Sequence, residues 1–251
     1  MRRLIHLTLS PSCRLARLMV GEKRVTCDPV LAEDFKQSMP VFVDMDGTRA
    51  EGVWAILDHL ENNYPDYPLA PSDDAARRAC LRWVDWAFGP FHEQVTQRIV
   101  YEKAAPRHTG AGFSRPPDMN AIRAGREDLK QALKAIGTAA ETNGNLACRE
   151  TTLGDLAVAA HLSSLDYFGE VPWTEFAAAR FCASHKKLAD DIASAVTATA
   201  ARQTCNAFAL FRMPAMALSA AAASWDHSDW EFQYLFLVIF QGNGHTKVSG
   251  S

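Results

Sequence analysis

The sequence predicts a chain of class α/β plus all-α, with a small α/β domain followed by a helical domain. Strand-like and helical patterns alternate up to residue 63, and the periodic segments after it have the three- or four-residue spacing of helices. Between the two parts, the stretch YPDYPLAP carries three prolines in eight residues, which is typical of a linker. We therefore place the α/β domain at residues 1–65, the linker at 66–72, the helical domain at 73–180 and a tail at 181–251.

The first domain opens with a β-α-β pattern. A short apolar run predicts a strand at about residues 3–9, and a second strand follows near 25–30. Between them the segment SPSCRLARLMVG predicts a helix over about 11–21, because Ser10 can cap its first turn and Pro11 fits the first helical position.

A further strand begins after Pro40 in the segment MPVFVDMDG. Proline cannot donate to a sheet ladder, so Pro40 is expected at the start of the strand, and the Met39–Pro40 bond is a candidate for the cis form. Asp46-Gly47 closes the strand with a strong hairpin-turn signal. A helix is predicted to follow over about residues 51–63.

Two helices are predicted in the first half of the second domain. The first has a kink at Gly89-Pro90 and the second covers about residues 122–136. Four aromatic side chains of the first helix could stack on a ligand, but at helical spacing they are more typical of a core. They are Trp83, Trp86, Phe88 and Phe91.

The segment TTLGDLAVAAHLSSLDYFGEVPW predicts a buried helix. Thr152 and Asp155 have the spacing of a capping box, in which the hydroxyl accepts from the N–H of 155 and the carboxylate accepts from the N–H of 152. Such a box before an apolar helix indicates a helix start without access to water. We expect His161 inside this helix to be a core or partly exposed residue and not a metal ligand, since no second ligand has metal spacing.

Composition excludes several classes of protein. The 251 residues carry a formal net charge of −3 and are 48% hydrophobic, which describes a globular chain and does not favour nucleic acid as a partner. The six cysteines have no CxxC spacing, which argues against a zinc site and a disulfide framework. The first apolar run is too short for a signal peptide, and FQYLFLVIF is too short to span a bilayer, so we expect a cytoplasmic protein.

Four motifs in order, SPSCRLAR, MPVFVDMDG, WAILDHLENNYPDYPLAP and TTLGDLAVAAHLS, resemble the glutathione S-transferase superfamily. The resemblance implies a thioredoxin-like N-terminal domain, a helical C-terminal domain, a homodimer and glutathione as cofactor. It also implies that Pro40 is cis and that Met39 and Pro40 present backbone groups to the glutathione cysteinyl moiety. In that superfamily the Thr152–Asp155 box is a folding element.

The resemblance assigns catalysis to a hydroxyl or thiol at the start of the first helix, where the helix dipole stabilises a thiolate. By its offset from Arg14, Ser10 matches the active serine of theta-like enzymes, with Ser12 second and Cys13 third. The alternative is that Ser10, Pro11 and Ser12 only begin the helix.

The resemblance also locates the site of the glutathione γ-glutamyl group, normally held by a Glu-Ser pair before the next helix. Gly52 and Val53 stand there, and neither side chain can bond a carboxylate or an ammonium. Two contacts, each worth about 1.5 to 3 kcal/mol, would be missing. Glu51 is one position away and could replace them only if the helix register shifted by a residue.

A subgroup of the superfamily, the FtsZ-binding division proteins of alphaproteobacteria, shares these departures. The segments RWVDWAFGPFHEQV, YEKAAPR and above all DYFGEVPW are similar to that subgroup. The resemblance implies a dimeric adaptor that binds FtsZ in bacterial cell division. A working transferase that conjugates glutathione to small electrophiles is the alternative.

The resemblance ends at about residue 180. From Phe181 onward the family motifs are absent, and the change is sudden enough to suggest a shifted reading frame. A genuine extension of the chain and a frameshifted, non-functional copy are the two alternatives that this leaves open.

Overall fold

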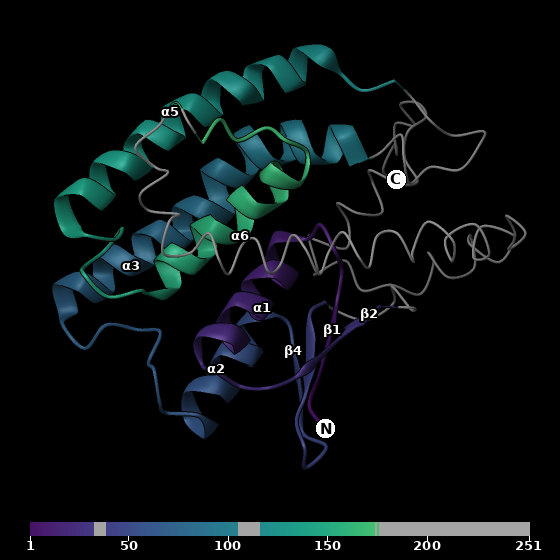
Figure 1. Ribbon diagram of the computed structural model, residues 1–251, viewed down its shortest axis with the longest axis vertical. Helices are drawn as coiled ribbons and strands as arrows, with labels where there is room; N and C mark the ends of the chain where they lie inside the picture. Colours follow the sequence, from purple (N-terminus) through teal and green to yellow (C-terminus); the bar gives the residue numbers. More distant parts are fainter. Residues whose placement is uncertain (33–38, 105–115, 174, 176–251) are drawn as a thin grey trace, which may run out of the picture.

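The computed structural model describes residues 1–32, 39–104, 116–173 and 175. A small sheet with two helices lies at one end of the molecule and a group of longer helices at the other, with α6 beside α1 at their junction (Figure 1). The four strands are β1 (Arg3–His6), β2 (Asp28–Leu31), β3 (Val41–Val43) and β4 (Arg49–Glu51). The helices are α1 (Pro11–Glu22), α2 (Val53–Asn63), α3 (Asp74–Trp86), η1 (Ala87–Tyr101), α5 (Met119–Asn143) and α6 (Leu153–Tyr167).

The sheet has the strand order β2-β1-β3-β4. β1 pairs with β2 in parallel, while β1 with β3 and β3 with β4 are antiparallel. In this register Ile5 lies opposite Val41, and Val41 opposite Glu51. The end of β1, the start of β3 and the end of β4 therefore meet at one edge, where the chain enters α1 and α2.

Both strands of the β-α-β unit are shorter than the sequence predicts. β1 stops at His6 instead of residue 9, because the carbonyl of Thr8 turns to accept a hydrogen bond from Arg14 Nε at 2.9 Å. β2 starts at Asp28 instead of 25, because Arg24 has a positive φ of 55° that turns the chain after α1. The predicted order of the elements is nevertheless present.

The hairpin turn at Asp46-Gly47 is present. Gly47 has a φ of 88°, which suits glycine, and Asp46 Oδ1 accepts from the Thr48 N–H at 2.9 Å. The chain returns as β4, a strand that the sequence analysis did not separate from the following helix. Because Glu51 pairs with Val41 in the ladder, α2 starts at Val53, two residues after its predicted start.

The predicted kink lies where α3 and η1 join. Gly89 has φ −105° and ψ −106°, outside the helical region, and Pro90 follows inside the helix. Proline lacks the N–H for an intrahelical bond and its ring clashes with the preceding turn, so the helix axis changes direction here. Phe91 is buried, and Trp83, Trp86 and Phe88 pack against the same core, which confirms the core interpretation of these aromatics.

A chain of hydrogen bonds joins the two parts of the molecule through the linker. Lys23 Nζ, with a side chain that is fully buried, pairs with Glu61 at 2.9 Å and donates to the Tyr64 carbonyl at 2.9 Å. The same Glu61 oxygen accepts from the Leu69 N–H at 3.0 Å. The Leu69 carbonyl then accepts from the Leu153 N–H at 2.9 Å, so the linker is bonded to α2 and to α6.

The predicted capping box is present at the start of α6. The Asp155 carboxylate accepts from the Thr152 N–H at 2.8 Å and from the Thr152 hydroxyl at 2.7 Å. Its other oxygen accepts from the Leu146 N–H at 2.9 Å, which the local spacing did not predict. Cys80 Sγ accepts from the Gly154 N–H at 3.2 Å. Asp155 is 0% exposed, so the donors from Thr152 and Leu146 replace water around its charge.

Replacing Asp155 by Asn is expected to lower the free energy of unfolding by about 3 kcal/mol. The amide keeps the shape of the carboxylate, but it loses the charge and turns an NH₂ group toward buried donors. Urea denaturation of Asp155→Asn measures this loss. Asp73→Asn is the matched control, since Asp73 caps α3 at an exposed position and Asn is an equally good cap. Equal effects of the two substitutions would contradict the assignment.

Buried imidazoles in the core predict a second effect, on the pH dependence of stability. His161 is 0% exposed, its Nδ1 lies 2.8 Å from Thr96 Oγ1, and its ring packs against the His92 ring at 5.5 Å between centroids. Burial, with His92 second, holds the pKa of His161 well below its usual value. Burial also lowers the pKa of His92 and of His6 to about 4.

The free energy of unfolding should therefore fall as the pH drops from about 6.5 to 4. The folded state keeps these imidazoles neutral, whereas the unfolded chain protonates them near their usual pKa of about 6.5, so the unfolded state binds more protons in this window. Each histidine adds a slope of up to about 1.4 kcal/mol per pH unit. Denaturant titrations across this range test the prediction, and His161→Gln should reduce the slope. A flat profile above pH 4 would contradict it.

Candidate functional site

The sheet register brings most of the predicted glutathione-site residues to one edge of the N-terminal part. The Met39–Pro40 bond is cis, as the sequence predicts. The Pro40 carbonyl accepts from the Gly52 N–H at 2.8 Å, which joins the start of β3 to the start of α2. Cys13 and Met39 belong to one apolar cluster, so the first turn of α1 lies beside the cis-proline.

Ser10, Ser12 and Cys13 lie in the first turn of α1. Ser10 is the N-cap residue, and its Oγ accepts from the Cys13 N–H at 3.4 Å. Ser12 is 6% exposed and Cys13 is 0% exposed. The arrangement shows the capping role of Ser10 directly, while its predicted catalytic role stays a prediction.

The position that the resemblance assigns to the γ-glutamyl group has a conformational reason to be glycine. Gly52 has a φ of 81°, a region that other residues rarely adopt, and it caps α2 without a side-chain hydrogen bond. Val53 is buried in the core. Glu51 stays in the β4 ladder and its carboxylate pairs with Arg49 at 3.2 Å, so the shift of register that would bring Glu51 to this position is not present.

The second candidate region is the segment DYFGEVPW, which ends α6. Gly169 has a φ of 68°, and its N–H donates to the Asp166 carbonyl at 2.8 Å. The Glu170 N–H donates to the Leu165 carbonyl at 3.2 Å. These two bonds form a Schellman motif, in which a left-handed glycine stops the helix. Trp173 Nε1 donates to Asp166 Oδ1 at 2.6 Å and folds the segment back onto α6.

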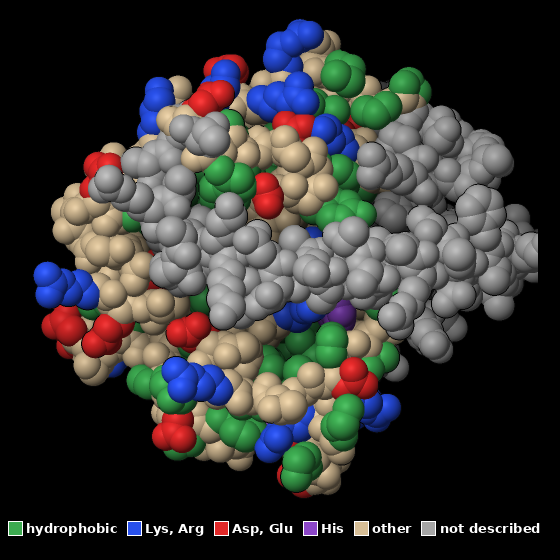
Figure 2. All heavy atoms as spheres, in the orientation of Figure 1, with side chains coloured by type: hydrophobic (Ala, Val, Ile, Leu, Met, Phe, Trp, Pro, Cys, Tyr) green, Lys and Arg blue, Asp and Glu red, His purple; other side chains and the backbone are tan. Residues whose placement is uncertain are grey.

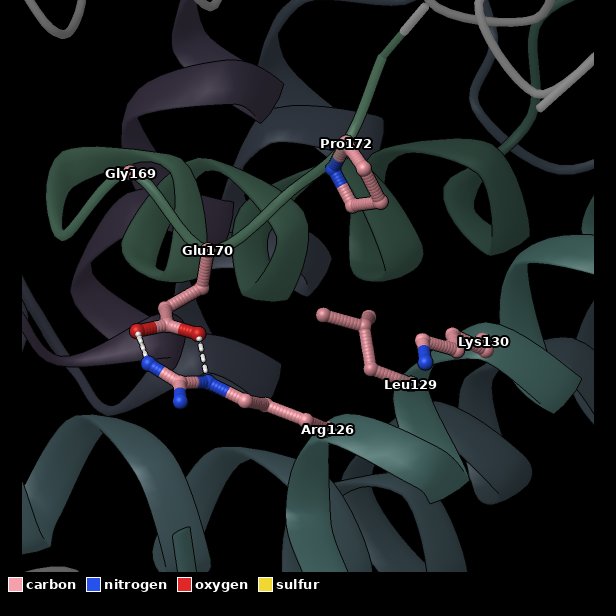
Figure 3. A pocket seen from close by; sticks show the side chains of 6 residues that line it. All are labelled: Arg126, Leu129, Lys130, Gly169, Glu170 and Pro172. Carbon is pink, nitrogen blue, oxygen red and sulfur yellow. Dashed lines mark hydrogen bonds and ion pairs between the residues drawn. The ribbon is translucent and has the colours of Figure 1, made fainter. Parts of the chain in front are cut away.

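The Schellman motif directs Glu170 toward α5 and the end of η1. Arg126 donates to both Glu170 oxygens, at 2.7 and 2.8 Å (Figure 3). Lys103 also donates to Oε1. We name Lys103, Arg126 and Glu170 the Glu170 cluster. The Glu170 side chain is 5% exposed, and the hydrogen bond from Arg126 is the main reason that its pKa lies below the usual value. The cluster fastens three helices together.

A half-open hollow of about 270 Å³ lies beside the Glu170 cluster. Leu129 and Lys130 of α5 face Gly169, Glu170 and Pro172 across it, with Arg126 at its edge (Figure 3). The sequence analysis did not identify this site. Lys103 and Glu170 do lie in YEKAAPR and DYFGEVPW, two segments that carry the resemblance, so those motifs were the available signal.

The described residues give no support to several other kinds of site. Within them no three His, Cys, Asp or Glu side chains are placed to hold a metal ion, and none of their helices combines the length and apolar character needed to cross a membrane. No disulfide joins the four cysteines of this part to one another. On the face seen in Figure 2, acidic and basic side chains are interspersed over both parts of the molecule, without an extended patch of one sign.

Comparison with known proteins identifies the fold of the chain. The chain is 35% identical over 201 residues to FtsZ-localized protein A of Caulobacter vibrioides (strain NA1000 / CB15N), covering 71% of this chain and 83% of that protein. A crystal structure of a glutathione S-transferase from Rhodospirillum rubrum F11 superimposes with a TM-score of 0.66 at 32% identity, covering 73% of this chain and 87% of the other. The structure of FzlA from C. crescentus gives 0.65 at 33%, covering 72% and 85%. No family model matches.

These matches confirm the predicted fold class of a thioredoxin-like domain followed by a helical domain, and they confirm the resemblance on which it was based. The predicted tail and frameshift, with Cys182 and Cys205, lie outside the described residues. The domain boundaries at 65 and 72 stay predictions.

Glu170→Gln is expected to lower the free energy of unfolding by about 1 to 2 kcal/mol. It removes the charge that Arg126 and Lys103 share, but both cations are partly exposed and can regain water. Thermal or urea denaturation measures the loss. Glu127→Gln is the control, because Glu127 and Lys130 form an exposed ion pair on α5, the helix that also carries Arg126. A loss no larger than that of the control would show that the cluster contributes little.

Proposed function

The chain belongs to the family of FtsZ-localized protein A, built on the glutathione S-transferase fold, and we propose that it is an adaptor that binds FtsZ in bacterial cell division. The observation that carries this proposal is the 35% identity over 201 residues, which spans 83% of that relative. YEKAAPR and DYFGEVPW are the segments of this chain that resemble the subgroup. FtsZ filaments are therefore the partner that we expect, with the cytoplasm as the location.

The arrangement at the edge of the sheet supports an adaptor over a transferase. Gly52 offers only backbone atoms where the superfamily holds the glutathione γ-glutamyl group, and Glu51 is engaged with Arg49. Each missing contact to a charged group is worth about 1.5 to 3 kcal/mol, so two of them lower the affinity for glutathione by orders of magnitude. We propose that glutathione is not a tightly bound cofactor of this chain and that no metal takes its place.

A glutathione transferase that uses Ser10 is the second candidate. The cis-proline and the helix start at Ser10 favour it, because both are features that the superfamily uses to bind the cysteinyl group. This candidate requires backbone groups to hold the γ-glutamyl end. A homodimer follows from the family resemblance for both candidates and is part of the proposal.

The test is co-sedimentation of the purified chain with GTP-assembled FtsZ of the same organism, beside a thermal melt with and without millimolar glutathione. We expect the chain to pellet with the filaments, and we expect the melt to stay unchanged. A ligand at 100 times its dissociation constant adds about 2.7 kcal/mol of stability, so strong glutathione binding would be visible as a shift. Light scattering on the same sample gives the mass and tests the dimer.

The outcomes separate the candidates. A chain that stays in the supernatant while glutathione raises its melting temperature would replace the adaptor by the transferase. A chain with no cooperative transition would instead favour the non-functional copy. Translation of the gene in its other two frames is the direct test of that third candidate, since a shifted frame should restore the family's sequence after residue 180.

A further inference from the structure

The outer side of α5 carries a row of basic side chains. They follow one another at spacings of three or four residues, so they share one face of the helix. They are Arg123, Arg126, Lys130 and Lys134, and all of them are exposed. At a rise of 1.5 Å per residue, the row is about 16 Å long and one side chain wide. We name it the α5 row.

Nearby carboxylates neutralise the α5 row only in part. Glu127 pairs with Lys130 at 2.8 Å, but the two side chains are 66% and 47% exposed, so water screens this pair. Glu127 and, less strongly, Glu175 raise the pKa of Lys130. Arg123 and Lys134 form no ion pair within the part of the chain that the structure describes. The row therefore keeps an excess of positive charge.

The hollow of about 270 Å³ beside the Glu170 cluster lies against this row. Arg126 and Lys130 belong both to the row and to the wall of the hollow, while Leu129 and Pro172 supply apolar surface (Figure 3). The two walls are joined, because Arg126 donates to both oxygens of Glu170. The Glu170 charge is neutralised in the same bonds, so it does not repel an anion at the row. The hollow is therefore preformed and has room for one apolar side chain.

A preformed hollow beside basic side chains fits an acidic protein segment that also carries an apolar residue. Its carboxylates would pair with the row, and its apolar side chain would fill the hollow. Nucleic acid and anionic lipid match the charge of the row, but the chain as a whole has a net charge of −3, which does not attract extended polyanions.

We propose that the α5 row and the hollow together bind an acidic segment of a partner protein. The acidic character of the segment follows from the charge of the row. Its assignment to FtsZ rests on the proposed function, in which FtsZ is the partner of this chain.

The probe for this site is a synthetic peptide of glutamates around one central leucine, labelled with a fluorophore and titrated with the full chain by fluorescence anisotropy. We expect binding that weakens with salt, because the charges of the row are exposed. Replacing the leucine of the peptide by serine should weaken binding about tenfold, since the hollow then buries no apolar side chain.

Arg123→Glu combined with Lys134→Glu should weaken binding of the leucine peptide at least tenfold. Both side chains are exposed and lie outside the ion pairs described above, so a thermal melt should show an intact fold. Arg3→Glu combined with Arg78→Glu is the matched control, with the same change of net charge at exposed positions on β1 and α3. If the row variant does not fold, Lys134→Glu alone should weaken binding at least threefold.

Co-sedimentation of the same variants with GTP-assembled FtsZ separates this site from the proposed function. We expect the wild-type chain and the control to pellet and the row variant to stay in the supernatant. If all of them pellet alike, the adaptor stands and the site is overturned. If the wild-type chain binds the peptide as expected but does not pellet, the site stands and the adaptor proposal fails.

Two further results would overturn the site. One is a wild-type chain that does not bind the leucine peptide, or binds it no better than the row variant does. The other is binding of single-stranded DNA or of phosphatidylglycerol vesicles that is as tight as binding of the peptide, since the row would then recognise negative charge of any kind.

Discussion

The Asp155 carboxylate is the interaction on which the rest of the structure depends. It is completely buried, and it fixes the first turn of α6 through Thr152 and the preceding loop through Leu146. The helix that it starts packs against α1, α3 and η1, so an error in its position would be transmitted to both parts of the molecule. Leu153, the first residue of α6, is also where the linker is bonded through Leu69. One charge therefore sets the position of the linker and of the central helix.

At both ends of α6, backbone groups that the helix itself leaves unpaired have hydrogen-bond partners. At the start the partner is the Asp155 carboxylate. At the end the chain turns at the left-handed Gly169, and the N–H groups of Gly169 and Glu170 donate to carbonyls of the last turn. Glu170 then extends the effect to α5 and η1 through Arg126 and Lys103. Between the two caps, Ser164 Oγ donates to the Leu9 carbonyl and ties the helix to the N-terminal part at 3.2 Å. The two parts are held as one unit by groups that lie on α6.

Local spacing explains which features the sequence could predict. Three predicted features depend on residues within a few positions of one another, so the local sequence is enough to predict them. They are the capping box, the Asp46-Gly47 turn and the kink at Gly89. The Lys23–Glu61 pair and the Glu170 cluster join residues far apart in the chain, and the spacing of residues along the sequence does not predict such ion pairs. The strand ends were misplaced for a related reason. Arg14 captures the Thr8 carbonyl and Arg24 adopts a positive φ, and both effects depend on the folded context.

The candidate glutathione site has features that depend on backbone geometry and features that depend on side chains. The cis-proline and the helix start at Ser10 are determined by backbone geometry, and the fold keeps them whether or not a cofactor binds. Recognition of a γ-glutamyl group depends on side chains. At the corresponding position Gly52 has none; its positive φ suits glycine, and its N–H donates to the Pro40 carbonyl. The backbone outline of such a site and the side chains that bind a charged ligand are therefore independent features of the fold. An adaptor of the kind proposed above would use the exposed surface of this fold and would not need those side chains.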